Sequence, residues 1–267
     1  GANWGNGRYT SAVLSFDLYG DPSMDFWGNG ADVRGPWPMF HYDWRGRGQT
    51  SLAGPGLLGQ VYWTVDIAPT PAGSRVPSPV VNRDNRVVIG DSSGMVRSID
   101  MAGNVLWSYQ TDGPIDTAPA LGLAGTIYVQ TKNGTLYAIR KDGTLQWSRT
   151  VGQSDASPKV AADGRIYVGG SDNNGPGGST RYLLMAYRAD GVRKGLAELD
   201  GRVTTTPSFG SDRVWVGTAA GTLYELSPDL EMVVGHPLTL GTAIGDGLAV
   251  SNDALQMVLV PTIDGRM

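Results

Sequence analysis

A small residue followed by proline recurs along this chain at an almost constant spacing, and this repeat constrains the fold more than any other feature. The landmark occurs at Ser78-Pro79, Ala118-Pro119, Ser157-Pro158 and Thr206-Pro207. The prolines are 40, 39 and 49 residues apart, and the longest interval contains a ten-residue loop insertion at 171–180. A sequence that repeats every 20 to 50 residues or so is typical of solenoids, propellers and other repeat arrays.

Each proline is followed by two segments that have the composition of β-strands. The first is short and apolar, at 87–89, 127–129, 166–168 and 214–216. The second follows a turn, at 94–100, 134–140, 182–188 and 221–227. β-Branched and aromatic residues fill these segments, and Gly, Asn and Asp bound them, as strands joined by hairpin turns require.

A third landmark is the pattern Gly-x-x-x-Trp, in which the tryptophan begins a further strand. It occurs at Gly59–Trp63, Gly103–Trp107 and Gly143–Trp147. One repeat therefore contains four short strands in about 40 residues, the size of a propeller blade. We predict an all-β fold, a β-propeller of four-stranded antiparallel blades. The alternative is a β-sandwich with accidental self-similarity, but a sandwich does not explain three landmarks that recur in phase.

Two of these repeats match a longer pattern. Ser98-Ile-Asp100-Met-Ala-Gly103-Asn-Val-Leu-Trp107 follows Ala-x-Asp-x-x-Gly-x-x-x-Trp, and residues 138–147 repeat it with Arg140 in place of Asp. The segment 37–43 reads Trp-Pro-Met-Phe-His-Tyr-Asp. These features resemble the pyrroloquinoline-quinone-type β-propeller repeat superfamily, over roughly residues 37–260. The resemblance implies that each tryptophan docks on the neighbouring blade. We therefore assign a structural role in blade docking to Gly59, Trp63, Gly103, Trp107, Gly143 and Trp147.

The two ends of the chain each carry part of a blade. Residues 10–20 resemble a third strand, whereas 246–250 and 255–260 resemble a first and a second strand. Together with a fourth strand at 60–67, they would make one blade split between the N- and C-termini, and five blades in all. The residues that we expect to close this blade are Val13, Leu14, Phe16, Met257 and Leu259.

The split blade can close in two ways, and the sequence leaves both open. The strand at 10–19 can complete the blade of its own chain, where its effective concentration is high. It can instead complete the open blade of another copy by β-strand addition, which gives a head-to-tail contact. The expected organisation is a completing strand at 1–19, a Gly-, Pro- and Trp-rich strap at 20–58 and the propeller at 59–267.

Residues 20–58 show no strand periodicity, and they concentrate aromatic side chains. One interpretation is a strap that covers a face of the propeller and buries these rings. The other is a recognition surface for a protein or a glycan, with Trp27, Trp37, Phe40 and Trp44 as its interaction residues. A structureless segment of this length is unusual in a compact domain unless it has a function.

Composition excludes several classes of function. The 267 residues include no cysteine, so a disulfide framework, a thiolate zinc site, an iron–sulfur cluster and a cysteine nucleophile are excluded. The two histidines, His41 and His236, lie in no recognisable catalytic motif. The net charge of −4 argues against a nucleic-acid partner. No apolar stretch approaches the roughly 18 residues of a membrane span.

Three polar features are candidate sites with simpler alternatives. Asp116 and Asp155 each stand three residues before a blade proline, where carboxylates could face a central channel and bind a cation. Only two of the five equivalent positions are acidic, which favours a solvated loop. Residues 172–175, Asp-Asn-Asn-Gly, could wrap calcium but lack the spacing of an EF-hand, which favours an exposed turn. Asn133-Gly134-Thr135 is a glycosylation sequon and also a good hairpin turn.

We therefore expect a non-enzymatic scaffold for protein–protein interaction or assembly, secreted, periplasmic or on the bacterial cell surface. A self-assembling extracellular subunit is its most specific form. Quinone-dependent dehydrogenases of the superfamily are longer, have eight blades and often carry a vicinal disulfide, so we expect no cofactor and no catalytic residues here. The alternatives are a propeller that binds a carbohydrate or small ligand, and a dehydrogenase remnant.

Overall fold

The computed structural model describes residues 63–71, 77–210, 212–232, 237–250 and 257–264. These residues form eighteen β-strands and one short 3-10 turn, η1 at Pro176–Gly178, with no α-helix among them. The predicted completing strand at 1–19 and the strap at 20–58 lie outside the described residues, so the proposed division of the chain into these parts stays a prediction.

The strands form four complete antiparallel sheets, each built from consecutive strands, followed by a two-stranded sheet. Blade 1 contains β1 Val80–Val81, β2 Val87–Gly90, β3 Met95–Ile99 and β4 Val105–Gln110. Blade 2 contains β5 Ala120–Leu121, β6 Ile127–Gln130, β7 Thr135–Ile139 and β8 Leu145–Thr150. Blade 3 contains β9 Lys159–Val160, β10 Ile166–Asp172, β11 Arg181–Tyr187 and β12 Arg193–Leu199. Blade 4 contains β13 Ser208–Phe209, β14 Val214–Gly217, β15 Thr222–Leu226 and β16 Leu238–Thr239. The fifth sheet contains β17 Ala249–Val250 and β18 Val258–Leu259.

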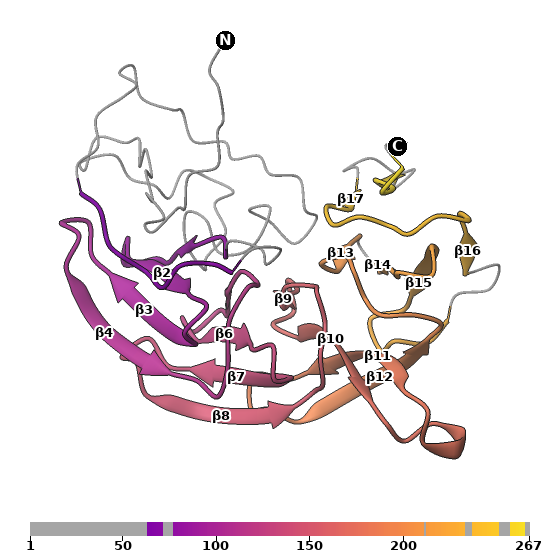
Figure 1. The fold of residues 1–267 in the computed structure, drawn as a ribbon, viewed down its shortest axis with the longest axis horizontal. Helices are drawn as coiled ribbons and strands as arrows, with labels where there is room; N and C mark the ends of the chain where they lie inside the picture. Colours follow the sequence, from indigo (N-terminus) through magenta and orange to yellow (C-terminus); the bar gives the residue numbers. More distant parts are fainter. Residues whose placement is uncertain (1–62, 72–76, 211, 233–236, 251–256, 265–267) are drawn as a thin grey trace, which may run out of the picture.

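The sheets follow one another around a curve, from indigo to yellow in Figure 1. The first strands of neighbouring blades meet, since β5 packs beside β9 and β13 beside β17. The fourth strands β4, β8 and β12 lie at the periphery (Figure 1). This arrangement confirms the predicted all-β fold of four-stranded antiparallel blades.

The hydrophobic core lies between successive blades. One cluster joins Val80, Val88 and Val96 of blade 1 to Leu121 and Ile127 of blade 2. Similar clusters join blade 2 to blade 3 and blade 3 to blade 4. A blade that is covered on both faces needs apolar side chains on both faces of its inner strands. For this reason β2 and β6 are buried along their whole length, although their sequences do not alternate between apolar and polar residues.

The C-terminal half of the predicted split blade is present, and one expected strand is not. β17 and β18 lie within 246–250 and 255–260, where a first and a second strand were predicted. The predicted fourth strand at 60–67 is wrong for residues 63–67, which are not in a strand. A fourth strand needs a third strand as its partner, and the predicted third strand, residues 10–19, lies outside the described part of the chain. The count of five blades stays a prediction.

Candidate functional site

Tryptophan side chains link successive blades through Trp107 of β4 and Trp147 of β8, and Trp63 links the segment before blade 1 to that blade. Trp63 lies against Gly103, where an added Cβ would stand 2.8 Å from the indole Cγ. Trp107 lies in the same way against Gly143, again with a 2.8 Å approach. Both glycines have a left-handed φ, +86° and +89°, which glycine adopts without steric cost. The close approach and the backbone conformation therefore both require glycine at these two positions.

Each indole also makes a polar contact with the following blade. Nε1 of Trp63 donates a hydrogen bond to the carbonyl oxygen of Met101 at 2.9 Å, and Nε1 of Trp107 donates to that of Lys141 at 3.0 Å. In both cases the acceptor lies two residues before the glycine that the ring covers. Gly59, the remaining residue predicted to take part in blade docking, lies outside the described residues.

Trp147 makes the most buried of these contacts. It lies against Gly191, and its Nε1 donates to the carbonyl oxygen of Ala189 at 2.8 Å. Its ring lies 5.8 Å from that of Tyr128 and 6.3 Å from that of Tyr187, measured between centroids. Only 8% of its surface is exposed, so Trp147 contributes to the hydrophobic core between blades 2 and 3. Its hydrogen bond to Ala189 also fixes how the two blades lie against each other.

At the junction between blades 3 and 4, a glycine and a leucine take the place of the tryptophan and glycine of the earlier junctions. Gly195 pairs with Ala186 in the way that Trp147 pairs with Ala138, so it occupies the tryptophan position. Leu230 packs against it and is buried, with a φ of 68°. The carbonyl oxygen of Pro228, two residues before Leu230, accepts hydrogen bonds from the Tyr167 hydroxyl at 2.7 Å and from Arg165 at 2.8 Å.

A second type of link between blades is an aspartate that binds two threonines of the next blade. The carboxylate of Asp112, in the connection after β4, accepts hydrogen bonds from the hydroxyl groups of Thr131 and Thr135 at 2.7 and 2.5 Å. The backbone N–H of Asp112 donates to the Tyr137 hydroxyl at 3.1 Å. Burial is the largest effect on Tyr137 and raises the pKa of its hydroxyl, so this group stays neutral.

The same clasp joins blades 3 and 4. Asp200 accepts hydrogen bonds from Thr218, at 2.9 Å, and from Thr222, and its N–H donates to the Tyr224 hydroxyl at 2.9 Å. The sequence analysis missed both clasps. Their signal is the pattern Thr-x-x-Gly-Thr-Leu-Tyr, which occurs at 131–137 and again at 218–224.

Asp91, at the end of β2, ties the segment before blade 1 to that blade. Its side chain has no exposed surface and accepts hydrogen bonds from Ser93 at 2.5 Å, from Arg97 and from the backbone N–H of Ala68 at 3.3 Å. Burial alone would raise the pKa of this carboxyl. The hydrogen bonds from Ser93, Arg97, Ala68 and Met95 outweigh it and hold the pKa below its ordinary value.

The residues before the blade prolines form a series of hydrogen bonds that runs from one blade to the next. The backbone N–H of Ala118 donates to the Ser157 hydroxyl at 3.0 Å, and that of Ser157 donates to the Thr206 hydroxyl at 3.3 Å. The N–H of Thr206 donates to the Asp246 carboxylate at 2.8 Å. The landmark that defines the repeat therefore also connects blade 2 to blade 3, blade 3 to blade 4 and blade 4 to the fifth sheet.

The carboxylates considered as cation ligands are paired with basic residues instead. Asp116 lies 2.7 Å from the Lys132 ammonium, and Asp155 lies 2.9 Å from the Arg202 guanidinium. The described part of the chain contains no group of three or more His, Asp or Glu side chains that could hold a metal ion. The structure therefore does not bring Asp116 and Asp155 together as a site for a cation.

The two polar turns have structural partners. Asp172 binds the Arg181 guanidinium through two hydrogen bonds of 2.9 and 2.7 Å, and this contact holds the pKa of its carboxyl well below the usual range. The pair extends the β10–β11 hairpin, which leaves 173–175 in the turn. Asn133, in the sequon, is exposed and donates a side-chain hydrogen bond to the carbonyl oxygen of Asp112.

The fifth sheet is a short pair of strands, β17 and β18, and it exposes apolar side chains to solvent. Val250 pairs with Val258 and Ala249 with Leu259, and among the described residues β18 pairs with β17 alone. Of the residues expected to close the split blade, Met257 and Leu259 are 58% and 60% exposed. Val13, Leu14 and Phe16 lie outside the described residues, as do the proposed interaction residues Trp27, Trp37, Phe40 and Trp44.

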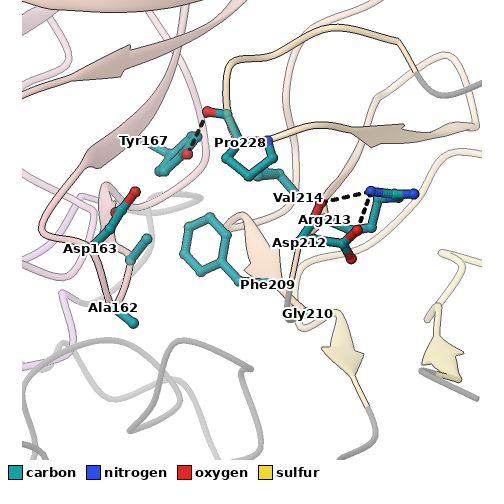
Figure 2. A pocket seen from close by; sticks show the side chains of 10 residues that line it. Ala162, Asp163, Tyr167, Phe209, Gly210, Asp212, Arg213, Val214 and Pro228 are labelled. Carbon is teal, nitrogen blue, oxygen red and sulfur yellow. Dashed lines mark hydrogen bonds and ion pairs between the residues drawn. The ribbon is translucent and has the colours of Figure 1, made fainter. Parts of the chain in front are cut away.

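A cavity of about 160 Å³ opens between blades 3 and 4. Tyr167 and Phe209 point toward it from the two blades, and Pro228 and Val214 lie beside them (Figure 2). The two aromatic rings are tilted by 55° with centroids 4.9 Å apart. Asp163 and Arg213 lie at its rim (Figure 2). No sequence landmark indicated this cavity.

These observations define the chain as a PQQ-type β-propeller repeat protein. A family model described as "Outer membrane protein assembly factor BamB" matches residues 57–175 and 114–230. The chain therefore belongs to this family. The described residues contain no helix with the length and hydrophobicity that a membrane span requires. Among curated proteins, no sequence matches the chain.

Solved propellers resemble the structure at low sequence identity. BamB from Moraxella catarrhalis is 19% identical over 76% of this chain and 70% of that one, with a TM-score of 0.43. The quinohemoprotein alcohol dehydrogenase from Comamonas testosteroni is 16% identical over 70% of this chain, with a TM-score of 0.52. The chain spans 39% of the length of that dehydrogenase, and the likeness concerns the fold alone.

Proposed function

We propose that this chain is a non-enzymatic, protein-binding scaffold that acts in assembly at the bacterial cell envelope. The observation that carries the proposal is the family match over residues 57–230. The description of that family model names an assembly factor of the outer membrane. A propeller suits this role, since its rigid blades hold many loops and outer strands in fixed positions for a partner.

The chemistry of the described blades supports a scaffold over an enzyme. Asp91, Asp112 and Asp200 use their carboxylates to hold neighbouring segments together. Asp116 and Asp155 are each neutralised by a basic side chain, so this donor set does not fit the calcium-and-quinone centre of a related dehydrogenase. We derive no catalytic step for the chain.

Photo-crosslinking in the native bacterium tests the proposal. A photoreactive phenylalanine analogue would replace Leu106, Leu196 or Leu238, which are exposed on outer strands of different blades. We expect crosslinks to protein components of the envelope from at least one position, identified by mass spectrometry. Oxidation of alcohols by the purified full chain with added quinone and calcium, and no protein crosslinks, would contradict the proposal.

We further propose that the fifth sheet is an assembly site. β17 and β18 supply a first and a second strand, and residues 10–19 have the pattern of the missing third strand. In this view the strand from one copy pairs with β18 of another and links the copies head to tail. Closure of the blade within one chain is the alternative.

Native mass spectrometry of the full chain separates the two cases. Strand exchange predicts a ladder of oligomers that collapses to monomer in a Leu14→Pro variant, because proline cannot donate a hydrogen bond to a strand ladder. Asn6→Pro, outside the predicted strand, is the matched control and should keep the ladder. A single monomeric mass for the unmodified chain at all concentrations would exclude strand exchange.

A further inference from the structure

Basic side chains gather on blades 2 and 3, around the β7–β8 and β11–β12 turns and the outer strands that follow them. We call this the basic surface and define it as residues 140–149 and 188–194. Its charged side chains, all exposed, are those of Arg140, Lys141, Asp142, Arg149, Arg188, Asp190, Arg193 and Lys194. Six are cationic and two are anionic, so the surface has a net charge of +4, whereas the whole chain carries −4.

Contacts between the two blades bring these segments together. Nε of Arg149, on β8, donates a hydrogen bond to the carbonyl oxygen of Gly191 at 3.0 Å, and its guanidinium carbon lies 5.6 Å from the centroid of the Trp147 ring. Arg193 pairs with Tyr187 across β11 and β12. Burial raises the pKa of the Tyr187 hydroxyl, and Arg193 and Arg149 oppose this rise, so both guanidinium groups lie near it. The outer strand of blade 2 and the turn of blade 3 therefore form one continuous surface.

The turns of blades 2 and 3 carry arginine where blade 1 carries aspartate. In all three turns, the glycine that a tryptophan covers donates its N–H to the carbonyl oxygen of the equivalent residue, which is Asp100, Arg140 or Arg188. The Asp100 carboxylate accepts hydrogen bonds from backbone N–H groups of its own turn. In blades 2 and 3, Asp142 and Asp190, two residues further along, accept such a bond instead. Each turn thus keeps the carboxylate that it needs and gains a cation.

Most of the positive charge on the basic surface is not neutralised by ion pairs. Arg188 lies 2.7 Å from the carboxylate of Asp190. Asp142 is bound instead by the N–H and hydroxyl of Thr144, at 3.0 and 2.7 Å. The other five basic side chains of the surface form no ion pair with a carboxylate in the part of the chain that the structure describes. Their charges are therefore available to an anionic partner.

Acidic residues border the surface on both sides. The corresponding turn of blade 1, residues 100–104, contains Asp100 and no basic residue. The corresponding turn of blade 4, residues 227–231, contains Asp229 and Glu231 and no basic residue. Arg165 of blade 3 lies between Asp229, at 2.6 Å, and Asp163, at 3.1 Å, so it is already paired. An anionic partner would therefore be attracted to blades 2 and 3 and repelled by the turns beside them.

Exposed aliphatic side chains stand among these cations. Leu145, the first residue of β8, is 40% exposed, and Val192, just before β12, is 49% exposed. Basic residues around exposed aliphatic ones are typical of surfaces that lie on anionic membranes, because the cations attract the lipid headgroups and the apolar side chains enter the interface. The strands β8 and β12 lie at the periphery of the fold (Figure 1), where a flat membrane can reach them.

We propose that the basic surface binds the face of an anionic phospholipid membrane. In this contact the lipid phosphates lie against the basic side chains, and Leu145 and Val192 enter the headgroup layer. The contact goes beyond the proposed protein-binding function, since it would orient the propeller with blades 2 and 3 toward the membrane. We favour a membrane over an acidic protein segment because the aliphatic side chains are exposed on both blades, on the outside of the fold.

Vesicle sedimentation with the purified full chain tests the inference. One set of vesicles contains phosphatidylcholine alone, and the other contains phosphatidylcholine mixed with phosphatidylglycerol. We expect binding to the mixed vesicles to be at least about tenfold stronger, and to weaken at least about fivefold when NaCl is raised from about 0.05 M to about 0.5 M. Equal binding to the two sets, or no binding to either, would overturn the inference.

Paired charge variants locate the contact. The double variant Arg193→Gln, Lys194→Gln removes two exposed cations and should weaken binding to the mixed vesicles at least about tenfold. The matched control is Lys132→Gln, Arg202→Gln, which changes the net charge equally. Lys132 precedes β7 and Arg202 follows β12, so both lie at the strand ends away from the basic surface. Equal losses in the two double variants would show that net charge alone matters and would overturn the inference.

The aliphatic contact separates a membrane from an acidic protein. Val192→Ser keeps every charge and should weaken binding to the mixed vesicles about threefold, while binding of soluble polyglutamate stays unchanged. If Val192→Ser binds the vesicles like the parent chain, and polyglutamate displaces the parent from them, an acidic segment is the partner and the inference fails. If vesicles are not bound while photo-crosslinking still captures envelope proteins, the inference fails and the scaffold function stands. If vesicles are bound and crosslinking captures no protein, the proposed function fails instead.

Discussion

Leu230 packs against Gly195, and this pair reverses the sizes found at the earlier blade junctions. Elsewhere a large tryptophan covers a glycine of the next blade, as Trp147 covers Gly191. At the junction between blades 3 and 4 the small residue, Gly195, lies on blade 3 and the large one, Leu230, on blade 4. The N–H of Leu230 donates to Ser227 at 2.9 Å, as that of Gly191 donates to Arg188, so the turn itself is retained. The large side chain is thus supplied by blade 4 at this junction, and leucine is smaller than the tryptophan found at the earlier ones.

Exchanging the two residues should restore the arrangement of the earlier junctions. Gly195→Trp alone should be strongly destabilising, because even a Cβ there would lie 2.7 Å from the Asp229 carbonyl oxygen and 3.1 Å from Leu230. Leu230→Gly alone should cost about 2–5 kcal/mol through the cavity that it leaves. The double variant should recover about 1–3 kcal/mol relative to the sum of the single effects, measured by urea unfolding.

The control for this pair is Leu238→Ala, which truncates an exposed leucine of β16. It should change the free energy of unfolding by less than about 0.5 kcal/mol. Strictly additive effects in the Gly195–Leu230 cycle would contradict the view that the two residues share one packing site.

The docking tryptophans should differ in their contribution to stability. Trp147→Ala should lower the free energy of unfolding by about 3–5 kcal/mol, because the ring is buried between two tyrosines. Trp63 and Trp107 are only half-buried, so their alanine variants should cost less. Urea unfolding of the three variants gives the order, and an equal loss for all three would be inconsistent with this difference in burial.

The repeat could be predicted from the sequence because its landmarks are local. Proline fixes the entry to each first strand, and Asn133-Gly134 and Asp142-Gly143 supply turns with positive φ. Each of these signals acts within a few residues, so the four blades and the pair β17–β18 follow from spacing alone. The two-residue length of first strands such as β1 and β5 is not visible in this way, because it depends on pairing with the second strand.

The contacts between blades could not be predicted with the same success. The sequence presents Asp116 as a possible ligand in a channel, with a solvated loop favoured, and its ion pair with Lys132, 16 residues later, is not visible there. Gly195 stands where the repeat has tryptophan, and Leu230, which packs against it, lies 35 residues later in the chain. Contacts between residues so far apart in the sequence depend on how the folded segments pack together. The repeat pattern within one blade does not predict this packing. The aspartate clasps did leave a repeated pattern, but its meaning depends on Asp112 and Asp200 in the preceding blade.

The clasp between blades 3 and 4 should be worth more than an ordinary surface charge. Asp200→Ala leaves the hydroxyl groups of Thr218 and Thr222, both buried residues, without their acceptor. We expect a loss of about 1–2 kcal/mol in the free energy of unfolding, since hydrogen bonds to charged groups are stronger than neutral ones. Glu231→Ala, at an exposed carboxylate, is the control and should have little effect. Equal, small effects of the two substitutions would show that the clasp adds nothing to stability.

Alkaline pH should destabilise the fold through its buried tyrosines. Burial raises the pKa of both Tyr128 and Tyr167 to about 12, from an ordinary value near 10. A group whose pKa is raised in the folded state keeps its proton there while the unfolded chain loses it. The stability is therefore fully present below pH 10 or so and is lost as the pH rises toward 12, by up to about 1.4 kcal/mol per pH unit for each tyrosine.

Tyr128→Phe separates this effect from general alkaline denaturation. The variant keeps the ring beside Trp147 and removes the titrating hydroxyl, so its free energy of unfolding should fall less steeply than that of the parent between about pH 10 and 11.5. Urea unfolding at a series of pH values gives the two slopes, and absorbance at the phenolate band reports ionisation in each state. Parallel slopes for the two proteins would mean that Tyr128 ionises as easily in the folded chain as in the unfolded one, which its complete burial between blades 2 and 3 does not allow.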